Sequence, residues 1–205
     1  MAVPLRRRTR ARELALQFLY IMELRGESAM EELIPFVDHH TKGSRDTKGR
    51  GEVADFTLTL CRGVLENRPE LDTWIEAIAR NWRIERMAHL DRNILRIAIF
   101  ELVFEESTPY KVVINEAIDI AKRFSTAQSG SFVNGILDRA RVLIEESRKN
   151  TNGHPLPPDP VELKAAPTAV PTPACTPLTP SSDGFTSVQS STPSPPRARA
   201  QRDTH

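Results

Sequence analysis

The segment at residues 90–105 constrains the fold more than any other, because it is apolar on nearly every side of a helix. Its apolar residues include Ile94, Leu95, Ile97, Ala98, Ile99, Phe100, Leu102, Val103 and Phe104. A helix that is apolar all round is normally buried. Arg92 and Arg96 are four residues apart and mark one polar edge, with Asp91 beside them. The segment therefore predicts a central helix with other helices packed around it.

Residues 108–144 predict two further helices joined by a short polar turn. Thr108 can cap the first helix, and Pro109 suits its first turn, where a backbone N–H lacks a partner in any case. Each helix carries an apolar stripe at helical spacing, and residues 125–130 between them are small and polar. Gly135 lies inside the second helix, where it costs roughly 0.5–1 kcal/mol relative to alanine. That cost predicts a close approach to a neighbouring helix.

The preceding part of the chain also follows helical spacing. Residues 5–25 predict a helix that ends at Gly26, and Ser28 predicts the cap of a short second helix. Residues 39–51 predict a loop, residues 52–65 a third helix, and Pro69 the start of a fourth. Trp74 and Trp82 have aliphatic neighbours that favour core positions over base stacking. No run alternates with period two, so the chain predicts an all-α fold of about seven helices in two small subdomains.

The composition changes sharply near Asn150. Of the 16 prolines, 12 lie in residues 151–205, where Phe185 is the only Phe, Trp or Tyr. Such a segment buries too little apolar surface to offset the entropy cost of ordering it, so we predict disorder there. The sequence therefore predicts a helical domain at residues 1–149 and a disordered Pro-, Thr- and Ser-rich tail at residues 150–205.

Simple patterns argue against several kinds of site. Cys61 and Cys175 form no CxxC pair, and the adjacent His39 and His40 lack the Cys or carboxylate pattern of a metal site. No apolar run reaches about 18 residues, and the basic start is not followed by a signal-peptide pattern. Phosphate-binding loops and nucleophile motifs are absent from the sequence. These features predict a cytoplasmic protein that has no membrane span, metal, cofactor or catalytic centre.

An arginine run precedes the first acidic residue, Glu13, although the formal net charge of the chain is only +1. Cations at the start of a helix oppose the helix dipole, which indicates a use outside folding, such as contacts with RNA phosphates. A solvated basic face is the other interpretation. The members of the run are Arg6, Arg7, Arg8, Arg10 and Arg12.

Aromatic and amide side chains extend the predicted RNA surface. Gln17 is seven residues after Arg10 and shares its helix face, and Tyr20 follows one turn later. Phe124 and Phe132 flank the polar turn. Their rings can stack on unpaired bases or pack in the core, and the sequence leaves both open.

The chain resembles the NusB family of bacterial transcription antitermination factors in four segments that follow in the same order. They are RRRTRARELALQFLY, LDRNILRIAIFEL, PYKVVINEAIDIAKRF and SFVNGILDRA. The resemblance covers about residues 5–147 and leaves the tail unmatched. It implies a protein that binds single-stranded boxA RNA of nascent ribosomal RNA together with the ribosomal protein NusE. The RNA polymerase elongation complex is then an indirect partner.

The resemblance also implies roles for particular residues. The arginine run, Tyr20, Phe124, Gln128 and Phe132 match the RNA-facing side of the family, and Asp91 matches its NusE-facing side. Gln128 stands where an acid is frequent, and Ser131 where a lysine is frequent. Two alternatives stay open. NusB-like domains also occur at the front of RNA cytosine methyltransferases. Those enzymes need a following cofactor domain, and this sequence has its proline-rich tail there. The second alternative, which is the runner-up, is a helical module that binds only proteins.

Overall fold

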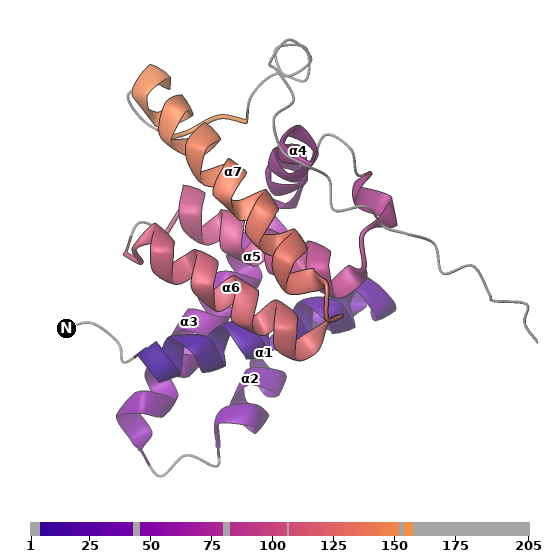
Figure 1. The fold of residues 1–205 in the computed structure, drawn as a ribbon. Coiled ribbons are helices and arrows are strands. Elements are labelled where there is room, and N and C mark those ends of the chain that lie inside the picture. Colours follow the sequence, from indigo (N-terminus) through magenta and orange to yellow (C-terminus); the bar gives the residue numbers. More distant parts are fainter. Residues whose placement is uncertain (1–4, 43–45, 80–82, 106, 152–153, 158–205) are drawn as a thin grey trace, which may run out of the picture. The chain divides into compact units, whose positions relative to one another are not determined.

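The computed structural model describes residues 5–42, 46–79, 83–105, 107–151 and 154–157. Within these ranges the chain forms seven α-helices, two short 3-10 helices and no strand (Figure 1). This confirms the predicted all-α fold. The α-helices are α1 (Leu5–Arg25), α2 (Leu33–Thr41), α3 (Thr47–Glu66), α4 (Arg68–Ile78), α5 (His89–Val103), α6 (Tyr110–Phe124) and α7 (Ser129–Thr151), and the 3-10 helices are η1 (Glu27–Glu32) and η2 (Ile84–Arg86).

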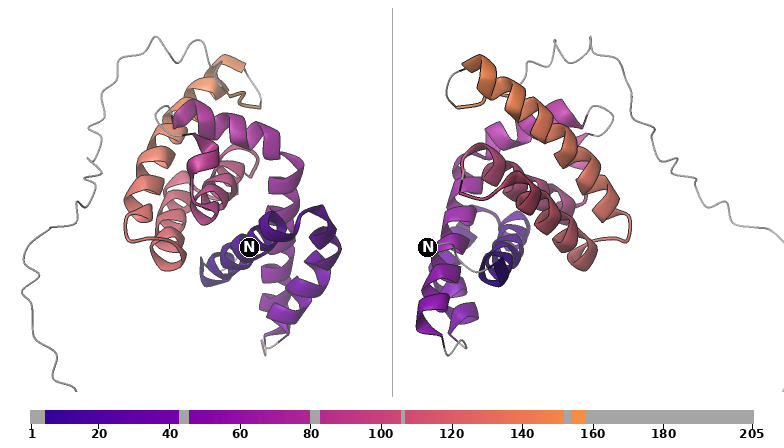
Figure 2. Two further views of the ribbon diagram at one scale, coloured as in Figure 1. Left: turned by 90° about the vertical axis from the view of Figure 1, so that its right-hand side faces the viewer. Right: turned by 60° about the vertical axis from the view of Figure 1, so that its left-hand side comes forward.

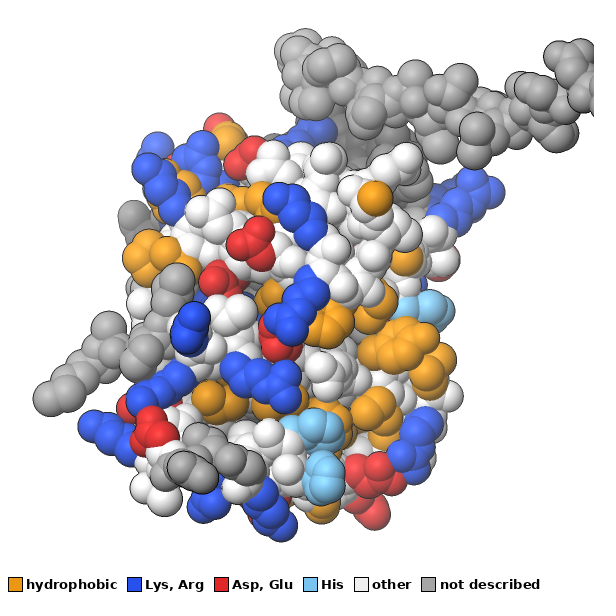
Figure 3. All heavy atoms as spheres, turned by 60° about the horizontal axis from the view of Figure 1, so that its bottom comes forward, with side chains coloured by type: hydrophobic (Ala, Val, Ile, Leu, Met, Phe, Trp, Pro, Cys, Tyr) orange, Lys and Arg blue, Asp and Glu red, His pale blue; other side chains and the backbone are white. Residues whose placement is uncertain are grey.

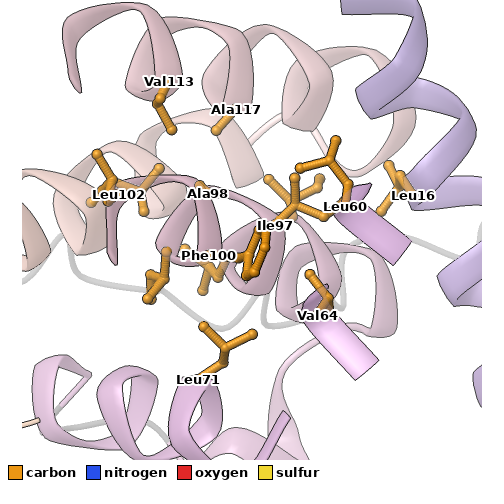
Figure 4. Close-up of a cluster of buried hydrophobic side chains, with 14 of the residues drawn as sticks. Leu16, Leu60, Val64, Leu71, Ile97, Ala98, Phe100, Leu102, Val113 and Ala117 are labelled. Carbon is orange, nitrogen blue, oxygen red and sulfur yellow. The ribbon is translucent and has the colours of Figure 1, made fainter. Parts of the chain in front are cut away.

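Helix α5 forms the centre of the core, as its apolar pattern predicts. Every residue from 93 to 103 is buried. Helices α1, α3, α4, α6 and α7 all pack against it. Figure 4 shows Leu16 of α1, Leu60 and Val64 of α3, Leu71 of α4, and Val113 and Ala117 of α6 around Ile97, Ala98, Phe100 and Leu102 of α5. Burying an aliphatic side chain of this size contributes about 1.5–3 kcal/mol, so this helix organises the stability of the fold.

The helices fall into two groups that share this core. Helices α1, α2 and α3 pack on one another, and α4, α6 and α7 pack around α5 (Figure 2). The groups meet where α1 and α3 contact α5. All described residues belong to one compact unit, Met1–Pro167. The two predicted subdomains are therefore two helical groups joined by one central helix.

Several predicted helix boundaries differ from the structure. The predicted loop at residues 39–51 is too long, because α2 continues to Thr41 and α3 begins at Thr47. Asp46 caps α3 by accepting a hydrogen bond from the Gly49 backbone N–H at 3.0 Å, which helps a glycine-containing start to remain helical. Ser28 lies inside η1 and caps no α-helix. Gly26 ends α1 as predicted, with a left-handed φ of 77°.

Trp74 and the start of the predicted tail both have defined positions in the structure. Trp74 is fully buried, which confirms its core position, whereas Trp82 lies outside the described residues. The predicted tail includes residues 150–157, and their described part has structure. Helix α7 continues to Thr151, His154 Nε2 lies 3.0 Å from Glu70 Oε1, and the Leu156 N–H donates to Ser147 Oγ. Disorder of residues 158–205 stays a prediction, because they lie outside the described residues.

Two glycines in helices predict opposite effects of added side-chain volume. A Cβ at Gly63 would overlap the ring of Phe100, whereas a Cβ at Gly135 meets no atom within 4 Å. The predicted close approach at Gly135 is therefore wrong. We expect Gly63→Ala to lower the free energy of unfolding by about 1–3 kcal/mol through overpacking. Gly135→Ala should raise it by about 0.5–1 kcal/mol. Urea unfolding of both variants measures this, and equal shifts would contradict the packing described for α3 and α5.

Candidate RNA interface

One face of α1 carries a polar and aromatic stripe at the surface. Arg6, Arg10, Gln17 and Tyr20 are spaced by four, seven and three residues, so they lie close to one line along the helix. Arg6, Arg10 and Tyr20 are exposed, and Gln17 is half-buried. The structure therefore places four of the predicted RNA-binding residues on one continuous face.

Arg12 lies on a different side of α1 and faces the core. Its side chain is only 2% exposed. Its Nε and Nη2 donate to the two carboxylate oxygens of Glu101 at 2.7 and 2.6 Å, and its Nη1 donates to Glu116 at 3.4 Å. This corrects the prediction that the whole arginine run is available to RNA. Arg12 is two residues from Arg10, and a separation of about 200° around the helix turns it inward.

Glu101 is the buried partner in this ion pair. Burial raises the pKa of the Glu101 carboxyl above its ordinary value, and the hydrogen bonds from Arg12 oppose that shift. The bidentate geometry compensates part of the cost of removing both charges from water. The pair thus fixes α1 against α5 and has no surface left for a ligand.

Arg7 and Arg8 are half-buried and also bind other parts of the chain. Arg7 pairs with Asp46 at 2.5 Å and with Glu52. The Arg8 guanidinium lies 4.5 Å from the ring centroid of Phe56 and donates to the Thr108 hydroxyl. Thr108 was predicted to cap α6, but the residue at the N-cap is Pro109 and Thr108 instead accepts this bond. Arg7 and Arg8 therefore hold α1 against α3 and the start of α6.

The C-terminal end of α6 adds an arginine that the sequence interpretation missed. Arg123 is 67% exposed at its side chain and donates to Glu13 Oε1. Arg10 donates to the other oxygen of the same carboxylate at 3.2 Å, and Glu13 is itself only 7% exposed. The Arg123 guanidinium also lies 5.3 Å from the ring centroid of Phe124. The adjacent Arg-Phe pair at the end of a predicted helix was the available signal for this position.

The turn between α6 and α7 presents the remaining predicted residues. Phe124 and Phe132 are half-buried and pack against the core, while Gln128 is exposed. The Thr126 backbone N–H donates to Ser129 Oγ at 3.2 Å, which orders the turn. Core packing and stacking on unpaired bases are both compatible with the position of the two phenylalanines, because each ring packs against the core and is still partly accessible.

Asp91 lies in the first turn of α5 and is 8% exposed. Its Oδ2 accepts a hydrogen bond from the buried Ser129 hydroxyl at 3.0 Å, and its Oδ1 is buried without a hydrogen-bond partner. The charge that the sequence places beside the polar edge of α5 is therefore buried. Asp91 joins the starts of α5 and α7. A negative charge in the first turn also interacts favourably with the helix dipole.

The Ser129–Asp91 bond can be tested without adding charge. We expect Ser129→Ala to lower the free energy of unfolding by about 1–3 kcal/mol, because the Asp91 carboxylate then loses its buried donor. Thermal melting measures the loss, and Ser131→Ala, which changes an exposed serine two residues away, is the matched control. Equal melting temperatures for the two variants would show that the bond contributes little.

These contacts bring the α1 stripe and the α6–α7 turn into one surface. Glu13 links Arg10 of α1 to Arg123 of α6. At the other end of the stripe, the Tyr20 ring meets His89 of α5 edge-on, with 6.4 Å between ring centroids. Figure 3 shows Lys and Arg side chains across the face that includes α1, with acidic side chains between them. Exposed guanidinium groups beside partly exposed rings suit single-stranded nucleic acid.

Other kinds of site find little support among the described residues. No group of three His, Cys, Asp or Glu side chains in that part of the chain could hold a metal ion. Burial raises the pKa of the Cys61 thiol to about 12, so this thiol is unreactive at neutral pH. None of the described helices is long and apolar enough to span a membrane.

Comparison with known proteins identifies the family. Residues 9–141 match the model of the NusB family. The chain is 43% identical over 143 residues to the transcription antitermination protein NusB of Anaeromyxobacter dehalogenans, covering 70% of this chain and 96% of that protein. It also resembles the T. maritima NusB structure, with a TM-score of 0.55, 36% identity and coverage of 69% and 93% of the two chains.

A second solved structure contains partners. It is a crystal structure of the antitermination factors NusB and NusE in complex with dsRNA, and it matches with a TM-score of 0.57 and 28% identity. The match covers 67% of this chain and 97% of that one. On the strength of the family model and the relative that it nearly spans, the chain belongs to the NusB family.

Proposed function

We propose that this protein is a transcription antitermination factor that binds boxA-type RNA of nascent ribosomal RNA together with NusE. Bound in this way, it supports processive transcription by RNA polymerase, which it contacts only indirectly. The observation that carries the RNA part is the exposed pair Arg10 and Arg123, held side by side by Glu13 next to Phe124. Family membership and the NusB–NusE relative with RNA support the choice of partners. Action on nascent transcripts places the protein in the cytoplasm, and the role requires binding without catalysis.

We assign the RNA contacts by chemistry and exposure. Arg6, Arg10 and Arg123 contact phosphates, because their guanidinium groups are at the surface. Tyr20, Phe124 and Phe132 offer rings to unstacked bases, and Gln17 and Gln128 offer amides to base edges. Arg7, Arg8 and Arg12 act indirectly by holding α1 in place.

For NusE we propose the surface around the N-terminal end of α5. Asp91 contributes to this surface by holding the start of α7 against α5, since it is buried and bonded to Ser129. Charge reversal at Asp91 therefore changes the fold locally as well as the surface. Ser129→Ala removes the same hydrogen bond without reversing a charge and is the reference for stability. A lowered NusE affinity of the Asp91→Lys variant supports the assignment only when this variant melts at nearly the same temperature as Ser129→Ala.

The decisive experiment is a titration of the full chain with boxA RNA and with a scrambled RNA, each with and without NusE. We expect boxA RNA to bind more tightly than scrambled RNA, and NusE to strengthen boxA binding further. Thermodynamic linkage requires that boxA RNA strengthens NusE binding by the same factor, which provides an internal check. If both RNAs bind equally and NusE binding is independent of RNA, the chain is a protein-binding module instead.

A further inference from the structure

We propose that Phe36, His39 and His40 near the end of α2 form a stacking site for an unpaired nucleobase of RNA that flanks the segment bound along α1. The inference rests on the proposed function, because it concerns nucleotides that continue from the RNA assigned to α1. None of these three residues belongs to the surface already described.

The rings form a connected series from the core to the surface. Phe18 of α1 is fully buried, and its ring centroid lies 5.4 Å from that of Phe36. The Phe36 ring lies 4.2 Å from the His40 ring at an interplanar angle of 37°. The exposed His39 and His40 rings then meet edge-on at 5.2 Å and 75°. The series ends in two exposed imidazoles beside the half-buried Phe36, which packs on the buried Phe18.

The orientation of His40 is fixed before any ligand binds. Its Nδ1 lies 2.8 Å from the backbone oxygen of Phe36, one helical turn earlier. A carbonyl oxygen only accepts hydrogen bonds, so Nδ1 carries the proton and Nε2 remains for an outside partner. A ring held in this way loses little conformational freedom when a base stacks on it, and preorganised contacts of this kind favour binding.

The position of α2 suits RNA that runs along α1. From α1, Glu13 reaches α6, Phe18 reaches α2 and Arg7 reaches the start of α3. Four residues lie between Thr41 and Asp46, the partner of Arg7, so the Cα atoms of Thr41 and Asp46 are within about 18 Å of each other. Figure 3 shows two adjoining histidine side chains on this face, with hydrophobic, basic and acidic side chains around them.

The chemistry favours a base over a phosphate at this point. The C-terminal end of a helix carries partial negative charge, which disfavours an anion beside His39 and His40. Histidine rings are among the side chains on which unstacked RNA bases stack, and every base offers a π-face. The site is therefore expected to add affinity with little dependence on base identity.

The test compares a boxA core RNA with the same RNA extended by a few uridines at its 5′ or 3′ end. The full chain is titrated with each RNA at one salt concentration. For the wild type, one of the two extensions should tighten binding by roughly 5- to 150-fold, the factor expected for one stacked base. His40→Ala should abolish this gain and leave affinity for the core unchanged, whereas His40→Phe should keep it. His154→Ala, which removes an exposed histidine beside Phe104, is the matched control and should keep the gain.

Each alternative result overturns the proposal. A full gain in His40→Ala, or no gain from either extension in the wild type, excludes the site while leaving the proposed function intact. A gain that His40→Lys keeps and His40→Phe loses shows a charge contact in place of stacking. If the core RNA itself fails to bind, the proposed function and this site are both excluded. As a second readout, 2-aminopurine in the extension should be quenched on binding to the wild type and not to His40→Ala.

Discussion

Replacing Arg12 with alanine is expected to lower the free energy of unfolding by about 3–5 kcal/mol, because it leaves the Glu101 carboxylate buried without its partner. For a domain of this size the melting temperature should fall by about 6–20 °C. The matched control is Arg6→Ala, which removes an exposed guanidinium from the same helix and should change stability by less than about 0.5 kcal/mol. Equal melting temperatures for the two variants would mean that Arg12 is not buried as described.

Two further measurements identify the mechanism behind this loss. In Arg12→Ala the Glu101 carboxyl keeps a raised pKa without the opposing hydrogen bonds, so the folded state binds a proton more readily than the unfolded state. Stability of the variant should therefore fall as pH rises from the unfolded carboxyl pKa of about 4.3 through the higher folded value. The double variant Arg12→Met, Glu101→Met should recover much of the lost stability, since it removes both buried charges. A loss that is independent of pH would point to packing alone.

Replacing Arg6, Arg10 and Arg123 together with alanine is expected to remove most of the salt dependence of RNA binding. Three phosphate contacts on a single strand give a slope of log K against log salt of about −2, at roughly −0.7 for each contact. The triple variant should bind boxA and scrambled RNA more weakly by similar factors, because phosphates carry no sequence information. Titrations at several salt concentrations measure the slope. The matched control replaces three exposed cations elsewhere, Arg62, Arg68 and Lys149, and should keep the wild-type slope.

Aromatic variants should behave differently from the arginine variants. Tyr20→Ala or Phe132→Ala should weaken binding by about 1–3 kcal/mol for each base that loses its stacking partner, with the salt slope unchanged. Phe132 also packs against the core, so native melting must be shown first. If the triple arginine variant keeps both the affinity and the slope of the wild type, the surface formed by α1 and α6 is not the RNA site.

The sequence predicted the order of the helices well because their apolar spacing is set by burial. The residues around α5 show this most clearly, since a segment that is apolar on all sides has only one favourable environment. Helix starts were predicted less well. Asp46 caps α3 and offsets a glycine-containing first turn, which composition alone suggested was a loop.

Which charged side chains of the site are exposed, and which are buried in ion pairs, could be established only from the three-dimensional structure. In the sequence, Arg10 and Arg12 are equivalent members of one basic run. Their environments differ because Arg12 binds Glu101 and Glu116, which lie on helices distant in the sequence. No pattern near Arg12 in the sequence predicts these partners. Arg123 stands beside Phe124 in the sequence, but the carboxylate that connects it to Arg10 is 110 residues away, so its place in the site was missed. Asp91 likewise meets its hydrogen-bond donor, Ser129, from a helix 38 residues further along the chain.

Glu13 has a thermodynamic consequence for RNA recognition. An arginine side chain carries about 2 kcal/mol of rotamer entropy, which is normally lost when it grips a phosphate. Glu13 already restrains both Arg10 and Arg123 in the free protein, so much of this entropy is lost during folding. The same carboxylate lowers the net charge of the surface, which weakens long-range attraction for polyanions in general. Glu13 therefore weakens non-specific attraction for polyanions and holds the two guanidinium groups in fixed positions. This arrangement favours a ligand whose phosphates match the spacing of Arg10 and Arg123.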